Sequence, residues 1–190
     1  NLVSDVGNAI YMYLADNCVV NKNRISLVHA SSFSITGIYL AGSSGNVISS
    51  NKIGDCKGNG ICANNGGRTL NAASTDNKIT GNIINNTLND GIYIGTGSTG
   101  TVISKNDVGV SNKSGIVVLD SKKCQVISNK VSDCRLDGIY LKNIGDTDIK
   151  SNNVTTVKRY GVQVISSQLK SLYGNTITGN GNCGLRIVQS

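Results

Sequence analysis

The residues best suited to acid–base chemistry are two aspartates with equivalent places in a repeated tetrapeptide. Asp90 and Asp137 each begin a copy of Asp-Gly-Ile-Tyr. All 11 acidic residues of the chain are Asp, so any pair of catalytic carboxyls must come from Asp side chains. In glycosidic-bond hydrolysis one carboxyl protonates the leaving group and a second activates water or attacks the sugar. Asp before Gly is also an ordinary turn residue, and this structural interpretation stays open beside the catalytic one.

The Tyr that ends the tetrapeptide suggests contacts with a sugar. Tyr39, Tyr93 and Tyr140 each follow an equivalent Gly by two residues, and Arg186 takes that position in another copy. Sugar rings pack their apolar faces on aromatic side chains, while their hydroxyls seek polar partners. Arg68 is a further candidate, in an inserted segment. These five residues are the expected substrate contacts, and a surface ladder of Tyr side chains without a ligand is the alternative.

These residues recur because the whole chain repeats. One register position, the Gly mark, is held by Ala9, Gly37, Gly60, Gly91, Gly115, Gly138, Gly161 and Gly184. A second series is formed by Asn23, Asn51, Asn82, Asn106, Asn129, Asn152 and Asn175. Both series settle to a spacing of 23 residues, so two unrelated residue types share one period. Longer intervals indicate insertions, expected as loops, near residues 26–36 and 64–75.

Apolar residues inside each repeat alternate with period two, which predicts strands. They lie one and three positions after the Gly mark, as in Ile92 and Ile94 or Ile139 and Leu141. Further apolar positions flank the Asn series, so each repeat is expected to supply at least three short strands and no helix. The sequence therefore predicts an all-β parallel solenoid of about eight coils, forming a single domain over residues 1–190.

The repeated Asn and Gly have structural explanations within such a solenoid. Coils stacked at ~4.8 Å place identical amides above one another, where they can hydrogen-bond along the stack. The Gly mark is expected to permit a tight corner or a positive φ angle.

The pattern N-x-I followed by G-I-x-[LIV], over residues 9–187, resembles the right-handed parallel β-helix of the pectate-lyase-like superfold. That family includes polysaccharide lyases, glycoside hydrolases, uronic-acid epimerases, adhesins and phage tailspikes. The resemblance implies the fold, and it implies by analogy that a polysaccharide would lie along an outward sheet face.

Two coils separate Asp90 from Asp137, which predicts ~9.6 Å between their backbones. Inverting glycosidases hold their carboxyls ~6.5–9.5 Å apart, and retaining enzymes ~5–5.5 Å apart. The expected spacing therefore favours an inverting pair. Asp120 is a third candidate, five residues after its Gly mark.

Other chemistries have less support in the sequence. The single His, His29, lies in the first insertion without a partner motif for nucleophilic catalysis. No cluster with metal-ligand spacing is present, so we expect neither a metal site nor a cofactor. A lyase reaction with a Lys, Arg or Tyr base stays open, without a pair of residues that stands out.

Composition bears on partners and location. The net charge of +7 is scattered, which argues against nucleic-acid binding, and no apolar run is long enough for a membrane span. Four coils (~19 Å) separate the equivalent cysteines, so the six cysteines are predicted to be free thiols, which suits folding in a reducing cytosol. Phage structural proteins fold there before they face the outside, whereas secreted enzymes do not.

The expected function is thus that of a phage tailspike-like or tail-fibre-like β-helix, a homotrimer on the virion tail that binds bacterial surface polysaccharide. In its catalytic form it would be a glycoside hydrolase. The alternatives are a non-catalytic stalk or adhesin module and a secreted, extracellular uronic-acid lyase or epimerase. The chain begins with Asn and is expected to be a fragment of a longer protein.

Overall fold

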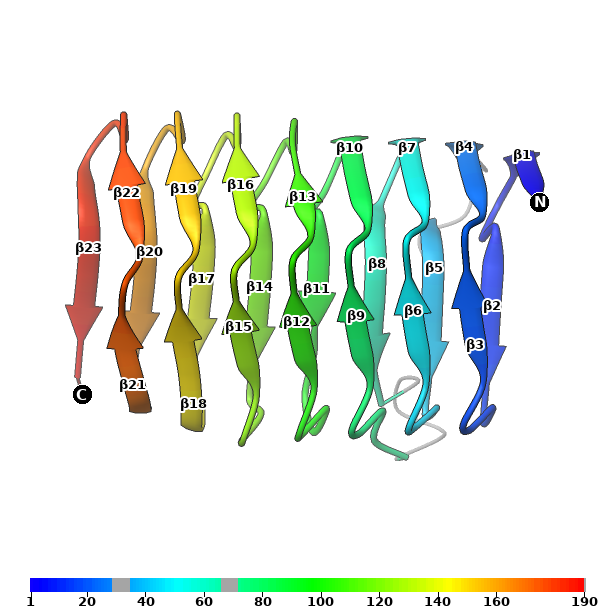
Figure 1. Ribbon diagram of the computed structural model, residues 1–190, viewed down its shortest axis with the longest axis horizontal. Coiled ribbons are helices and arrows are strands. Elements are labelled where there is room, and N and C mark those ends of the chain that lie inside the picture. Colours follow the sequence, from blue (N-terminus) through cyan, green and yellow to red (C-terminus); the bar gives the residue numbers. More distant parts are fainter. Residues whose placement is uncertain (29–34, 66–71, 190) are drawn as a thin grey trace.

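The computed structural model describes residues 1–28, 35–65 and 72–189, and its strands wind into a parallel β-solenoid (Figure 1). The described residues form 23 strands in three parallel sheets. Each sheet takes every third strand in chain order, so one coil adds one strand to each sheet. The two termini lie at opposite ends of the long axis (Figure 1). The predicted all-β solenoid of about eight coils is confirmed.

The strands are assigned to three sheets, which we number for reference. Sheet 1 contains β1 (Leu2–Val6), β4 (Arg24–Val28), β7 (Lys52–Cys56), β10 (Ile83–Thr87), β13 (Asp107–Val108), β16 (Lys130–Ser132), β19 (Asn153–Thr155) and β22 (Thr176–Thr178). Sheet 2 contains β2 (Ile10–Tyr13), β5 (Thr36–Ala41), β8 (Asn59–Asn64), β11 (Ile92–Ile94), β14 (Ile116–Leu119), β17 (Ile139–Lys142), β20 (Tyr160–Ile165) and β23 (Cys183–Val188). Sheet 3 contains β3 (Val19–Asn21), β6 (Val47–Ser49), β9 (Lys78–Thr80), β12 (Val102–Ser104), β15 (Gln125–Ile127), β18 (Gly145–Lys150) and β21 (Gln168–Tyr173).

The core is a column of β-branched and other apolar side chains enclosed by the three sheets. The residues that follow the Gly marks, such as Ile61, Ile92, Ile116 and Ile139, are fully buried. Strand alternation turns their neighbours outward, which frees the outer face of each sheet for other roles. Within residues 1–28, 35–65 and 72–189, no helix reaches the length and apolar character needed to cross a membrane.

The Asn series forms a buried ladder, as predicted. Asn129 shows the repeating contacts: its Oδ1 accepts hydrogen bonds from the backbone N–H and from Nδ2 of Asn106, both at 3.0 Å. Its own Nδ2 donates to Asn152 Oδ1 (3.0 Å) and to the carbonyl of Ile103 (2.9 Å). The same bonds recur along the series, so these amides replace the backbone pairing that is lost where the chain turns from sheet 3 into sheet 1.

Of the two explanations expected for the Gly marks, the positive φ angle is wrong. None of the seven Gly residues at the mark has a positive φ angle, and for the first six, Gly37 to Gly161, close approach between coils requires Gly. A Cβ atom on Gly115 would lie 2.8 Å from the carbonyl oxygen of Gly138 and still closer to Val131 Cγ1. A side chain at the mark would therefore force two coils apart.

The two insertions are narrower than expected. Residues 26–28 continue β4, where Ser26 pairs with Ser4 and Val28 pairs with Val6. At the second insertion β8 extends to Asn64. Residues 29–34 and 66–71 lie outside the described residues, and with them His29 and the predicted contact Arg68.

All six cysteines are free thiols, as predicted. Four are buried and two are exposed; the buried ones are Cys56, Cys62, Cys124 and Cys134.

Candidate functional site

One row of outward side chains runs along sheet 2, because its strands pair in register. Pairing aligns Tyr11, Tyr39, Cys62, Tyr93, Val117, Tyr140, Gln163 and Arg186 in this order. We call this series the outward row. Four of the five predicted substrate contacts, Tyr39, Tyr93, Tyr140 and Arg186, therefore lie on one face of the solenoid.

A groove follows the outward row. Its larger part has a volume of about 460 Å³, and its lining includes Asp90, Tyr93, Asp137, Tyr140 and Arg186. A smaller hollow of about 140 Å³ continues it toward the N-terminus between Tyr39 and Tyr93, with Tyr93 in both linings. The structure thus brings two of the three predicted catalytic residues together with four predicted contacts.

The two Asp side chains belong to one wall of this groove, at the beginning of the strands of sheet 2. Asp90 Oδ1 accepts the backbone N–H of Ser114 (2.9 Å), and Asp137 Oδ1 accepts that of Tyr160 (3.2 Å). Between them, Ser114 Oγ accepts the N–H of Asp137 (3.4 Å). Each side chain therefore links its own coil to the next, a structural role that differs from the turn residue considered in the sequence.

Burial changes the acidity of both carboxyls. It raises the pKa of Asp90, against the opposing effects of the hydrogen bond from Ser114 and of the nearby Lys113. It also raises the pKa of Asp137, against the hydrogen bond from Tyr160 and the charges of Arg159 and Arg186. Asp90 is half-buried, whereas Asp137 is only 3% exposed. A carboxyl that keeps its proton to higher pH is better suited to donate it to a leaving group.

Two arginines surround Tyr160 at the C-terminal end of the groove. The guanidinium carbons of Arg159 and Arg186 lie 5.3 Å and 5.2 Å from the ring centroid of Tyr160, within cation–π range. Arg159 Nε is 3.6 Å from Asp137 Oδ1. With its amide oriented to satisfy both neighbours, Gln163 donates from Nε2 to Asp137 Oδ2 (3.1 Å) and accepts from Arg186 through Oε1. This network fixes two cationic groups beside a buried carboxylate.

Arg159 and Tyr160 were not predicted from the sequence, although the sequence contains a signal for Arg159. Lys113 and Arg159 both lie two residues before a Gly mark, in alternate coils of the same groove.

The rings of Tyr39 and Tyr93 contact neighbouring residues on the outer side of sheet 2. Tyr39 Oη donates to Asn64 Oδ1 (2.9 Å), and a Cβ atom on Gly95 would be 2.9 Å from Tyr93 Cε1, so the Tyr93 ring covers Gly95. Burial raises the pKa of both Tyr39 and Tyr93. Both phenols are therefore neutral at physiological pH, which suits stacking and disfavours a role as base.

Asp120 lies away from this wall. It is exposed, follows the last residue of β14 and adopts a φ angle of 47°. Its carboxylate accepts hydrogen bonds from Asn143 Nδ2 (2.8 Å) and Thr96 Oγ1 (3.3 Å). These contacts identify Asp120 as a turn residue. It lies where the strands of sheet 2 end, whereas Asp90 and Asp137 lie where these strands begin.

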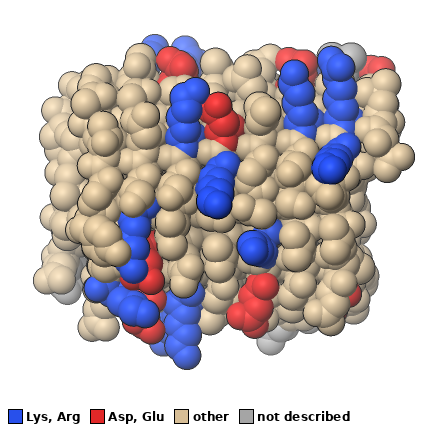
Figure 2. Space-filling model, viewed as in Figure 1, with Lys and Arg blue, Asp and Glu red and all other residues tan. Residues whose placement is uncertain are grey.

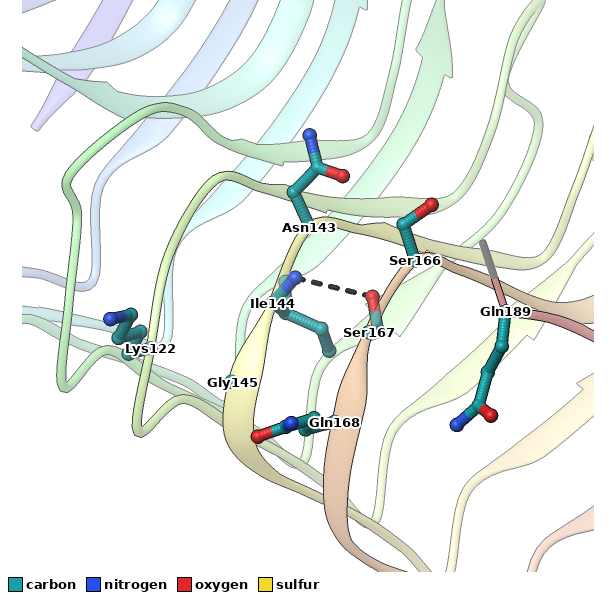
Figure 3. Close-up of a pocket in the computed structure, with 8 residues that line it drawn as sticks. All are labelled: Lys122, Asn143, Ile144, Gly145, Ser166, Ser167, Gln168 and Gln189. Carbon is teal, nitrogen blue, oxygen red and sulfur yellow. Dashed lines mark hydrogen bonds between the residues drawn. The ribbon is translucent and has the colours of Figure 1, made fainter.

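A second hollow, of about 510 Å³, lies where the strands of sheet 2 end, near the C-terminal coils (Figure 3). Lys122, Asn143, Ser166 and Gln168 contribute to its lining, and Ser167 Oγ accepts the N–H of Ile144 at 3.2 Å. Its described lining residues include neither a carboxylate nor an aromatic ring, so it lacks the groups that characterise the groove.

The face formed by sheets 1 and 3 carries a mixed charge pattern. Figure 2 shows Lys and Arg side chains dispersed among Asp and uncharged residues, without a continuous basic band. Four of these charges form two ion pairs there, Lys130 with Asp107 (3.2 Å) and Lys150 with Asp148 (2.9 Å). This dispersion agrees with the interpretation of the scattered charge in the sequence.

A parallel solenoid with a polar, aromatic-lined groove defines the class of this protein as a right-handed β-helix. The chain belongs to the family described as "Right handed beta helix region", which matches residues 1–108, and to the family described as "Periplasmic copper-binding protein (NosD)", which matches residues 63–190. None of the curated protein sequences compared with this chain matches it.

Solved structures share the fold at low sequence identity. A double mutant of the periplasmic alginate epimerase AlgG is 19% identical with a TM-score of 0.77, over 99% of this chain and 47% of the epimerase. The Dettilon tailspike protein is 20% identical with a TM-score of 0.74, over 98% of this chain and 40% of the tailspike. The A-module of the Azotobacter vinelandii mannuronan C-5 epimerase AlgE4 is 14% identical with a TM-score of 0.73, over 100% of this chain and 55% of the module. The chain thus spans about half the length of these proteins.

The copper named in one family description requires a set of soft ligands. Protein sites for copper use Cys, His and Met side chains. Burial raises the pKa of the thiols of Cys56, Cys62 and Cys134 to about 12 and that of Cys124 to about 11, so these thiols stay protonated at physiological pH. The part of the chain that the structure describes contains no group of three His, Cys, Asp or Glu residues that could hold an ion. The described residues therefore do not fit a copper centre.

Proposed function

We propose that this chain binds an extended polysaccharide along the outward row of sheet 2. The observation that carries the proposal is the placement of Tyr39, Tyr93, Tyr140 and Arg186 in one row of a groove, beside carboxyls on its wall. Flat aromatic faces with polar neighbours are the surfaces on which sugar rings pack. A row that follows the solenoid axis suits a polymer better than a small molecule.

In its catalytic form, this groove hydrolyses a glycosidic bond of a bacterial surface polysaccharide. Asp90, which is half-buried and has a raised pKa, is the proton donor to the leaving oxygen. Asp137 activates water from two coils away. The ~9.6 Å expected between the two backbones is close to the ~6.5–9.5 Å that inverting enzymes hold between their carboxyls. Asp137 is 3% exposed, so that water must enter from within the groove.

A lyase or epimerase reaction on a uronic acid is the second candidate. Arg159 and Arg186 support it, because a fork of guanidinium donors can hold the sugar carboxylate while a proton leaves the adjacent carbon. Tyr140 lies in the same groove and is the available base. Two of the structures reported above are epimerases of such sugars, which supports the candidate at the level of fold.

One assay separates these functions. The purified chain and its Asp90→Asn, Asp137→Asn double variant are incubated with capsular polysaccharides and with alginate. New reducing ends without unsaturated ends, lost in the double variant, identify the hydrolase. Reducing ends together with unsaturated ends identify the lyase, and a changed sugar configuration without chain cleavage identifies the epimerase. Binding without any of these products identifies the non-catalytic adhesin. If no polysaccharide binds, the proposal fails.

The biological setting that we propose is a trimeric phage tailspike, with a secreted protein as the alternative. The free thiols buried in the core support folding in a reducing compartment. Light scattering of the purified chain provides the test: a trimer supports the tailspike, and a monomer at all concentrations contradicts it.

A further inference from the structure

The chemistry of the groove alternates from one coil to the next. Two coils combine a carboxyl on the wall with a Tyr in the outward row, namely Asp90 with Tyr93 and Asp137 with Tyr140. The coils that follow them combine a basic residue with a buried, non-aromatic row residue. These are Lys113 with Val117 and Arg159 with Gln163.

The alternation determines how the Tyr rings lie. Where two Tyr of the row are adjacent, as in Tyr11 and Tyr39, the rings pack on each other with centroids 5.3 Å apart. Tyr93 and Tyr140 are instead separated by Val117, which is 3% exposed. The intervening coil frees each ring from a stacked partner, so its face is available to a ligand.

The same alternation places acidic and basic wall residues on successive coils, and Arg159 Nε reaches to 3.6 Å from Asp137 Oδ1. A carboxylated sugar beside the ionised form of Asp90 or Asp137 would place two anions close together in a partly buried groove, which costs binding energy. Beside Lys113 or Arg159, the same sugar would gain a charge-assisted hydrogen bond. The coils with Tyr therefore suit a neutral sugar that stacks, and the coils with a basic residue suit an acidic sugar.

Two coils span ~9.6 Å along the axis, the scale of a disaccharide in an extended chain. We infer that the groove recognises a polysaccharide whose repeating unit is a disaccharide of one neutral and one acidic sugar. The neutral sugars lie on Tyr93 and Tyr140 and the acidic sugars lie beside Lys113 and Arg159. This inference rests on the proposed polysaccharide groove and specifies its ligand class.

The experiment compares three sets of oligosaccharides of equal length by calorimetry. Hyaluronan oligosaccharides alternate an acidic and a neutral sugar, mannuronate oligosaccharides carry a carboxylate on every sugar, and cello-oligosaccharides carry none. The inference predicts about tenfold tighter binding of the hyaluronan set than of either homopolymer. Equal or tighter binding of a homopolymer would overturn it.

Two sets of variants test which coils of the groove favour an acidic sugar and which disfavour it. Lys113→Glu should weaken hyaluronan binding about tenfold, whereas Lys78→Glu, on the exposed surface of sheet 3, should leave it unchanged. The Asp90→Asn, Asp137→Asn double variant should shift the preference toward mannuronate, because it removes the repulsion beside every second sugar. Absence of both effects in variants with the circular dichroism of the parent chain contradicts the inference.

The two proposals fail in distinguishable ways. If Tyr93→Ala weakens binding of a homopolymer that the chain prefers, the polysaccharide groove stands and the alternating ligand is wrong. If none of the three sets binds, the alternating ligand is wrong, and the groove proposal also fails if the capsular polysaccharides and alginate do not bind either.

Discussion

The buried Asn ladder and the outward row of sheet 2 arise from the same repeat, yet they use it in opposite ways. In the ladder, every coil supplies the same residue, and each amide bonds to the next, as Asn106, Asn129 and Asn152 do. In the outward row, aromatic, aliphatic, amide and basic side chains follow one another. Repetition thus satisfies buried polar groups, while variation on an exposed face creates a surface that can discriminate between ligands.

The sharpest way to break the ladder is Asn129→Ala. The substitution leaves the backbone N–H of Asn106 without its partner in the interior, removes one of the bonds to the carbonyl of Ile103 and opens a cavity. We expect the free energy of unfolding to fall by about 4 kcal/mol. Urea unfolding measures the loss, and Asn153→Ala, on the exposed face of β19, is the matched control with an expected change below about 0.5 kcal/mol. Equal losses in the two variants would show that the ladder has no special role.

The Gly marks should be nearly as sensitive. Gly115→Ala places a Cβ atom against Gly138 and Val131 of the next coil, and we expect a loss of about 3 kcal/mol in the free energy of unfolding. Gly54→Ala is the control, because its Cβ would have only an ordinary contact of 3.6 Å. A thermal unfolding series that fails to separate these two variants would contradict the close-approach explanation.

The outward row should tolerate change. Tyr93→Ala removes a half-buried ring that covers Gly95, and we expect a loss of about 1 kcal/mol in the free energy of unfolding, well below that of the ladder variant. Urea unfolding beside Tyr173→Ala, which removes an exposed Tyr on β21, gives the comparison. A loss for Tyr93→Ala as large as that of Asn129→Ala would mean that the row is a structural element like the ladder.

The smallest effect concerns the pH dependence of stability. Because burial raises the pKa of Asp90, its protonated form stabilises the fold. This contribution is fully present below the unfolded pKa of ~3.9 and is lost as the pH rises through the folded pKa. Asp90→Asn, whose Oδ1 can still accept the N–H of Ser114, should therefore unfold at a higher temperature than the parent chain at neutral pH.

Thermal unfolding across the acidic range tests this sign. The advantage of Asp90→Asn should vanish below pH ~3.9. Asp120→Asn, an exposed change outside the groove, serves as the control. A variant that is less stable than the parent chain at neutral pH would contradict the role of burial at Asp90.

The solenoid could be predicted from the sequence because the contacts between its coils depend only on the spacing of residues along the chain. Residues 23 positions apart meet across coils, which suffices for the Asn ladder and for the row of Tyr93 and Tyr140. The positive φ angle expected at the Gly marks was wrong, because the backbone angle there and the approach of Val131 to Gly115 depend on how the coils pack. Arg159 was missed because its contact with Asp137 comes from the coil that follows, before its strand begins. The 3% exposure of Asp137 likewise results from neighbouring side chains that a repeat pattern does not reveal.

The central claim is that the outward row of sheet 2 binds a polysaccharide, and calorimetry with the preferred oligosaccharide tests it most directly. Each of the three Tyr rings is expected to contribute about 1 kcal/mol to the binding free energy by stacking on a sugar. The Tyr39→Ala, Tyr93→Ala, Tyr140→Ala triple variant should therefore bind about a hundredfold more weakly than the parent chain. Tyr173→Ala on sheet 3 should bind as the parent chain does. Parent-like affinity in the triple variant, or an equal loss in Tyr173→Ala, would contradict the claim.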